Sequence, residues 1–140
     1  MSKKIVILIV IIIVMLLGVV IYIKDGVEQV SLNNMYKDIS LLKDDIDLYY
    51  LKNDKLPIKN ELINFEYSSN PNDNEEFYEI NLEKLDNLSL SYGYNKNQND
   101  IYIVNVKSHT VYYYNGIKYK NEMHYTTKKD YTKIDLEKYQ

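Results

Sequence analysis

The sequence predicts an α+β fold in which one long N-terminal helix packs on a small antiparallel β-sheet. Three observations predict it: an uncharged aliphatic run at 5–23, a helix-spaced apolar stripe that follows without a break, and alternating β-branched and tyrosine residues in the C-terminal half. We divide the chain into a transmembrane helix (1–24), an amphipathic helix that continues it (25–57), a loop region with an antiparallel β-meander (58–127) and a charged C-terminal tail (128–140).

Composition and charge exclude several classes of function. The 140 residues include 17 lysines, no arginine and 20 acidic residues, for a formal net charge of −3. Residues 25–140 keep 14 of the lysines and all 20 acids, a formal charge of −6 that argues against nucleic-acid binding through phosphate neutralisation. The absence of cysteine excludes disulfides, thiol catalysis and cysteine-ligated zinc. The sequence also carries no glycine-rich phosphate loop, Ser-His-Asp set or His-Glu-x-x-His motif, so we do not expect an enzyme.

The apolar run 5–23 is long enough to cross a membrane. As a helix, its 19 residues rise about 28 Å. A buried core helix of that length would carry a polar face, and a cleaved signal peptide would have a shorter apolar core and a small-residue cleavage site. We therefore expect an uncleaved single-pass anchor in the cell membrane. Lys3 and Lys4 precede the run, so the positive-inside rule places the N-terminus in the cytoplasm and residues from about 25 onward outside.

An amphipathic helix should continue from the span and lie on the sheet. Its apolar stripe repeats at spacings of 4, 3, 4 and 3, and it consists of Met35, Ile39, Leu42, Ile46 and Tyr49. Leu41 and Leu48 widen the stripe. We expect the segment 53–57 to end the helix at Pro57, because proline disfavours helical geometry at the preceding residue and cannot donate a backbone hydrogen bond.

The C-terminal half predicts a meander of three to five short strands. Its expected strands are 88–94, 101–106, 111–114, 117–120 and 123–126. Asn115 and Gly116 are a strong two-residue hairpin signal. Residues 58–87 are harder to interpret: a short strand at 77–82 and a helical turn at 81–85 both remain open. One face of such a sheet needs a cover, which the striped helix supplies.

We expect no cofactor. His109 and His124 lie 15 residues apart on expected strands, and two surface histidines explain them more simply than a metal site. The segments 70–76 and 95–100 alternate oxygen-bearing side chains of the kind that ligate calcium. The first segment is not an EF-hand loop, since Glu75 stands where that loop needs glycine and Asn81 where it needs glutamate. Calcium binding stays possible in either segment, but solvated loops are the simpler interpretation.

The layout of span, uninterrupted amphipathic helix, proline-terminated turn and antiparallel sheet resembles a type IV pilin or a type II secretion pseudopilin. The segment 38–57 carries the likeness at the helix end, where a Leu-Tyr pair runs into Asn53-Asp54-Lys55-Leu56-Pro57. The segments 99–104 and 110–119 resemble strands of Gram-positive pilin-like proteins. The resemblance implies a structural role, with the membrane and other pilin-like subunits or assembly-platform proteins as partners.

The chain departs from that family at its N-terminus. Lys4 stands where the family has the glycine of the prepilin-peptidase site, and Ile9 stands where the mature chain has a glutamate. An acid inside a membrane is kept only for a task, so its absence points to a tip or accessory subunit, or to a pilin-like protein that stays unprocessed. The alternative is a single-pass anchored extracytoplasmic binding module, unrelated to filaments, that recognises a partner with its tyrosine-rich sheet.

Overall fold

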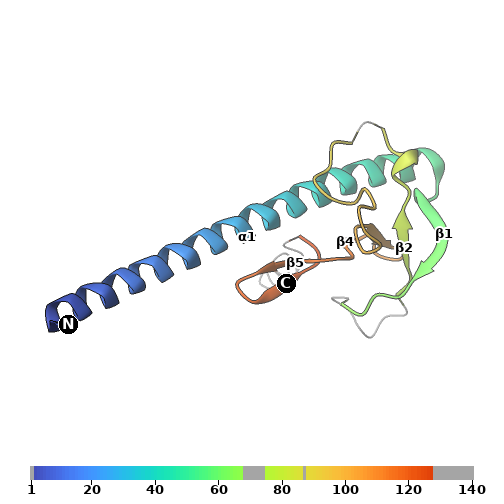
Figure 1. Ribbon diagram of the computed structural model, residues 1–140. Helices are drawn as coiled ribbons and strands as arrows, with labels where there is room; N and C mark the ends of the chain where they lie inside the picture. Colours follow the sequence, from blue (N-terminus) through green and yellow to red (C-terminus); the bar gives the residue numbers. More distant parts are fainter. Residues whose placement is uncertain (1, 68–74, 87, 128–140) are drawn as a thin grey trace, which may run out of the picture.

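The computed structural model describes residues 2–67, 75–86 and 88–127, and it consists of one very long helix with two small antiparallel sheets beside its C-terminal half (Figure 1). In chain order the elements are α1 (Lys3–Asn53), β1 (Ile58–Ile63), β2 (Phe77–Ile80), the 3-10 helix η1 (Leu82–Lys84), β3 (Tyr102–Asn105), β4 (Val111–Tyr113), β5 (Ile117–Tyr119) and β6 (Glu122–His124). The predicted α+β class and the long N-terminal helix are confirmed. The charged segment 128–140 lies outside the described residues.

Helix α1 runs unbroken for 51 residues, about 77 Å. Its N-cap is Ser2, whose hydroxyl accepts a hydrogen bond from the amide of Ile5 at 3.3 Å. At the other end Asp54 adopts a left-handed conformation with φ 55°, and its amide donates to the carbonyl of Tyr50 at 2.9 Å. This left-handed C-cap ends the helix.

The helix therefore ends at the start of the predicted segment 53–57, but Pro57 is not the residue that ends it. The helix is already closed at Asp54, and the segment that follows is extended. Pro57 is buried, and its carbonyl accepts a hydrogen bond from the amide of Asn81 at 2.8 Å. The proline ties the turn after α1 to the residue that follows β2.

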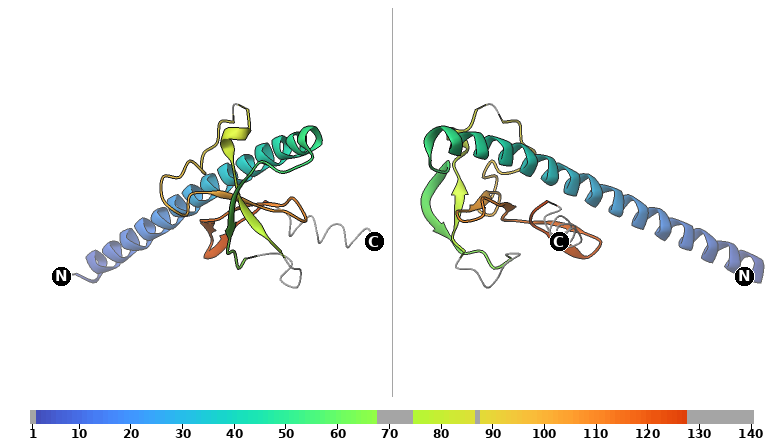
Figure 2. Two further views of the ribbon diagram at one scale, coloured as in Figure 1. Left: turned by 90° about the vertical axis from the view of Figure 1, so that its right-hand side faces the viewer. Right: turned by 180° about the vertical axis from the view of Figure 1, so that it is seen from behind.

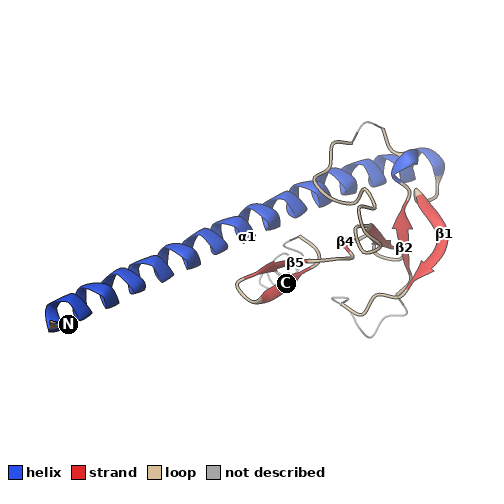
Figure 3. Cartoon of the chain, viewed as in Figure 1, coloured by secondary structure: helices blue, strands red, loops and turns tan. Residues whose placement is uncertain are grey.

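The larger sheet has the strand order β1-β2-β3-β4, with every pair antiparallel, and it lies across the C-terminal half of α1 (Figures 2 and 3). Alternate residues of β3 and β4 face opposite sides of this sheet. Tyr102, Val104, Val111 and Tyr113 join the core under α1. The other side holds a second, aromatic cluster composed of Phe65, Phe77, Ile101, Ile103 and Tyr112. Both faces of the central strands are covered.

The smaller sheet corrects the predicted hairpin. Asn115 and Gly116 do not join paired strands, because β4 pairs with β3 and β5 pairs with β6. They form instead a turn that carries the chain from one sheet to the other, with Gly116 at φ 72°. The hairpin turn between β5 and β6 is Lys120-Asn121, with φ values of 48° and 65°. Two consecutive positive φ angles are those of a type I′ turn.

The strand expected at 88–94 is absent from the described structure, where these residues form an irregular loop. Conversely, the segment that was hardest to interpret contains two strands and a turn. β1 is an edge strand with four exposed central residues, and its open edge explains why it lacks an apolar alternation. Phe77–Ile80 is a strand and Leu82–Lys84 is a single 3-10 turn, so both alternatives hold, one after the other.

Candidate functional site

The N-terminal half of α1 is an apolar surface with nothing from the described fold against it. Every large hydrophobic side chain from Ile5 to Ile23 is exposed, by fractions from 43% to 80%. The helix is long and apolar enough to cross a membrane. The mean hydropathy of its most apolar 18 residues is 3.6, and none of those residues is buried. A soluble core helix meeting the same criterion would be mostly buried, whereas a signal sequence would not. An apolar surface this large requires a cover of lipid or of other protein.

The C-terminal half of α1 carries the folded head. From the predicted stripe, Met35, Ile39, Leu42 and Ile46 are buried at 0–4% exposure, and Tyr49 is half-buried. Leu32 extends the buried face by one turn toward the span. Leu41 and Leu48 do not widen the stripe, because both point outward and are 36% and 54% exposed.

A buried carboxylate lies in the middle of this apolar face. Asp38 is 1% exposed and accepts hydrogen bonds from the amides of Ser91 and Tyr92 at 2.9 Å each. The hydroxyl of Tyr102 donates to the same carboxylate at 2.8 Å. Asp38 thus joins three parts of the fold: the helix, the irregular loop and the central strand β3. Because the amides of Ser91 and Tyr92 donate to Asp38, they are not available for pairing in the strand predicted at 88–94.

A second buried carboxylate organises the far end of the same loop. Asp100 is 3% exposed and accepts hydrogen bonds from the amides of Gly93 at 2.6 Å and Lys96 at 3.1 Å. The hydroxyl of Tyr113 donates to it at 2.8 Å. Burial alone would raise the pKa of Asp100, but these hydrogen bonds and the charge of Lys96 outweigh burial and hold the pKa below its usual value.

Two tyrosines link the carboxylates. Tyr102 and Tyr113 are register partners on β3 and β4, and their ring centroids lie 4.9 Å apart. Burial, followed by the hydrogen bond to Asp38, raises the pKa of Tyr102 far above that of free tyrosine. Burial, followed by the hydrogen bond to Asp100, also raises the pKa of Tyr113. Both phenols therefore stay protonated at neutral pH and act as hydrogen-bond donors to the two carboxylates that hold the loop.

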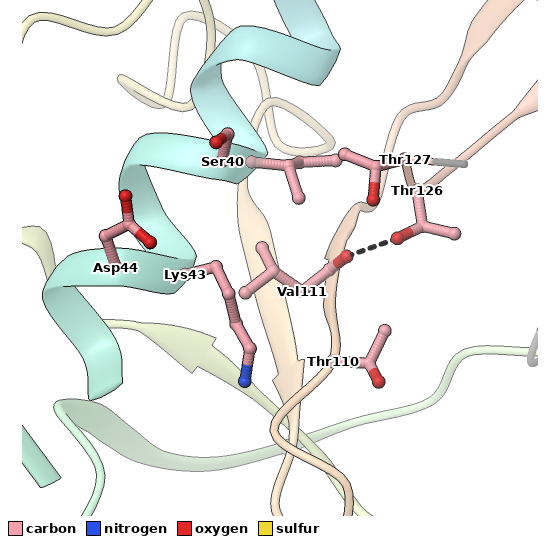
Figure 4. A pocket seen from close by; sticks show the side chains of 8 residues that line it. Ser40, Lys43, Asp44, Thr110, Val111, Thr126 and Thr127 are labelled. Carbon is pink, nitrogen blue, oxygen red and sulfur yellow. Dashed lines mark hydrogen bonds between the residues drawn. The ribbon is translucent and has the colours of Figure 1, made fainter. Parts of the chain in front are cut away.

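A cavity of about 410 Å³ opens between α1 and the start of β4 (Figure 4). Ile39 and Val111 supply apolar surface, and Ser40, Lys43, Asp44, Thr110, Thr126 and Thr127 complete the lining. The Lys43 ammonium group is engaged by Asp47 at 3.1 Å and by the His109 carbonyl at 3.2 Å, and the Thr126 hydroxyl donates to the Val111 carbonyl at 2.7 Å. The cavity therefore offers apolar surface and hydroxyl groups, whereas the Lys43 ammonium group and the Thr126 hydroxyl are already hydrogen-bonded within the protein.

The residues considered for metal binding are not brought together. His109 packs edge to face against Tyr50, with ring centroids 4.7 Å apart, whereas His124 lies on β6 near Tyr119. In the segment 95–100 the Asp100 carboxylate is taken up by the loop's own donors. Within residues 2–67, 75–86 and 88–127, no three His, Cys, Asp or Glu side chains are grouped to hold a metal ion. Most of the segment 70–76 lies outside these residues.

The sequence interpretation missed Asp38 and Asp100 as key residues. A signal for Asp38 was available, since it falls on the stripe face, three residues after Met35 and four before Leu42. An acid at that position must be paired or hydrogen-bonded once the stripe is buried. Nothing comparable marks Asp100, which ends a polar loop and differs from its neighbours only through the contacts it makes.

Comparison with known proteins adds no relative. No family model, no curated protein and no solved structure matches this chain.

Proposed function

We propose that this chain is a membrane-anchored, pilin-like structural subunit, minor or accessory, of a type IV pilus, competence or type II secretion-type filament system. The observation that supports it is the division of one uninterrupted helix: α1 leaves its first half wholly exposed and apolar, and it holds an antiparallel sheet with its second half. A subunit of this shape suits a role in which the apolar half moves between lipid and a bundle of similar helices while the head stays in water.

The N-terminal sequence supports an accessory position within such a system. The span contains no acidic residue that would neutralise the amine of a neighbouring chain, and Lys4 replaces the glycine of the peptidase site. The same two features favour a second candidate function, a single-pass anchored extracytoplasmic binding module that never leaves the membrane. Its contact surface would be the cavity lined by Ile39 and Val111, because the sheet tyrosines Tyr102, Tyr112 and Tyr113 are buried.

Cross-linking in cells that contain a pilus-type assembly system separates these candidates. The chain has no cysteine, so Val14→Cys introduces a single thiol at an exposed position of the apolar half. Asn64→Cys, an exposed position on the head, is the matched control. A filament subunit should give Val14→Cys adducts with a pilin that carries a cysteine at the equivalent position. A chain that stays in the membrane fraction without adducts would contradict the filament role and favour the binding module, and a chain recovered in the soluble fraction would contradict both.

Mass spectrometry of the N-terminus tests processing separately. We expect the intact chain to retain Met1 to Lys4, because the cleavage-site glycine is missing. A methylated N-terminus at Ile5 would show that the peptidase accepts lysine at this position.

A further inference from the structure

The hairpin formed by β5 and β6 lies close to the point where α1 leaves its apolar segment. The amide of Lys120, at the hairpin turn, donates to the Glu28 carboxylate at 3.1 Å. Glu28 follows Ile23, the last residue of the apolar run, by five positions, a helical rise of about 7.5 Å. The hairpin therefore extends further toward the N-terminus of α1 than any other labelled strand (Figure 1).

The rise from Ile23 to Glu28 is about the thickness of the headgroup layer on one side of a bilayer. Headgroups on each side add roughly 5 to 8 Å to the hydrocarbon core. If Ile23 lies at the edge of the hydrocarbon, the backbone at the hairpin turn lies at the outer edge of the headgroups. From there an extended lysine side chain can reach the lipid phosphates, because long cationic side chains extend toward a membrane surface to place their ammonium groups there.

The side chains at the hairpin turn fit such a surface. Lys118 and Lys120 are exposed, and Met123, the register partner of Lys118, is 46% exposed. The Lys120 ammonium group lies 5.3 Å from the ring centroid of Tyr119. The exposed methionine, the two lysines and the half-buried tyrosine combine apolar, cationic and aromatic groups in one hairpin, as interfacial segments do. Glu28 and Glu122 lie beside the turn, so the hairpin carries no net positive charge and the proposed contact depends on the position of the two lysines.

We propose that residues 118–123 lie in the headgroup layer of the membrane that α1 spans, with Lys118 and Lys120 contacting phospholipid phosphates. This rests on the membrane anchoring within the proposed function and adds a second, surface contact to it. The head is then fixed to the bilayer at two points, the helix and the hairpin.

Site-directed spin labelling of the full chain tests the contact. In vesicles of phosphatidylethanolamine and phosphatidylglycerol, a label at Met123→Cys should collide with a water-soluble nickel chelate several-fold less often than a label at Leu62→Cys. Leu62 is 58% exposed on the edge strand β1 and serves as the aqueous reference. Equal collision rates at the two positions would overturn the proposal. A third label at Leu16→Cys reports on the span itself, and exposure of that label to the chelate would contradict the anchoring, which separates the two failures.

Charge reversal tests the role of the lysines. The double variant Lys118→Glu, Lys120→Glu should raise the chelate collision rate at Met123→Cys toward the Leu62→Cys value. The matched control Lys55→Glu, Lys84→Glu changes two exposed lysines elsewhere on the head by the same charge. If both double variants leave the Met123→Cys label unchanged, the phosphate contact is refuted.

Discussion

The hydroxyl of Tyr102 donates a hydrogen bond to the Asp38 carboxylate at 2.8 Å, across the interface between the central strand of the sheet and the helix. Both residues are at most 2% exposed. The same carboxylate accepts hydrogen bonds from the loop amides of Ser91 and Tyr92, so one acid joins the helix to the loop and to β3. This contact motivates the first prediction.

Replacing Asp38 by alanine should destabilise the head strongly. The change leaves the buried phenol of Tyr102 and two partly buried loop amides without an acceptor, and an orphaned buried group costs about 1–3 kcal/mol. We expect the free energy of unfolding of the detergent-solubilised full chain, measured by denaturant titration, to fall by roughly 3 kcal/mol or more. Asp44→Ala, on the exposed side of the same helix, should change it by less than about 0.5 kcal/mol. Equal losses in the two variants would show that the Asp38 contacts contribute nothing specific.

Acid should weaken the attachment of the loop at Asp100. The pKa of this carboxyl is lower in the folded chain than the ordinary value of 3.8, so the folded state favours the ionised form. Its stabilisation is therefore present above the ordinary pKa and disappears as the pH falls through the lowered value. Thermal unfolding between pH 2 and 6 should show a stability gap between the wild type and Asp100→Asn that narrows below about pH 4. A difference in stability that stays constant over this pH range would contradict the lowered pKa of Asp100.

Alkali should act through the two linking tyrosines. Because the pKa values of Tyr102 and Tyr113 are raised in the folded chain, their contribution to stability is complete below about pH 10 and declines above it. Absorbance titration of phenolate should show part of the tyrosine signal appearing only when the head unfolds. That delayed fraction should shrink in Tyr102→Phe, whereas an unchanged delayed fraction would place the resistant phenols elsewhere.

Gly93 should not tolerate a side chain. It has φ 95°, and a Cβ there would lie 2.5 Å from a ring carbon of Tyr102. Gly93→Ala combines backbone strain with overpacking, so we expect a loss of about 2 kcal/mol or more in unfolding free energy. Gly26→Ala is the matched control: it lies in α1 with nothing within 4 Å of the added Cβ, and it should stabilise the helix by up to about 1 kcal/mol. Circular dichroism during thermal melting measures both.

The two faces of α1 should respond differently to truncation. Leu42 is fully buried, and Leu42→Ala should cost about 2–5 kcal/mol through lost burial and the cavity left behind. Leu51 is 81% exposed on the same helix, so Leu51→Ala removes almost no packing and replaces one good helix former by another. A Leu42→Ala variant as stable as Leu51→Ala would show that the helix does not hold the sheet through this face.

The helix and its buried face could be predicted from the sequence because both depend on periodic patterns. The loop 88–101 could not be predicted. The alternation of Leu88, Leu90 and Tyr92 is that of a strand, but the acceptor for the amides of Ser91 and Tyr92 is Asp38, more than 50 residues away. The prediction of a hairpin at Asn115-Gly116 was wrong for a different reason. Asn115-Gly116 has the favoured composition, but the strands on either side take different partners, and Lys120-Asn121 adopts the turn without any glycine.

The absence of any break in α1 has a mechanical consequence. From Ile23 to Asn53 the helix extends about 45 Å beyond its apolar run as one stiff rod. Membrane helices lean from the bilayer normal by about 20° on average. A rod of this length inclined by that angle carries its far end roughly 15 Å sideways. In a membrane, small changes in how the lower end of α1 leans would therefore become large lateral displacements of the sheet, and the contact proposed for residues 118–123 would oppose them.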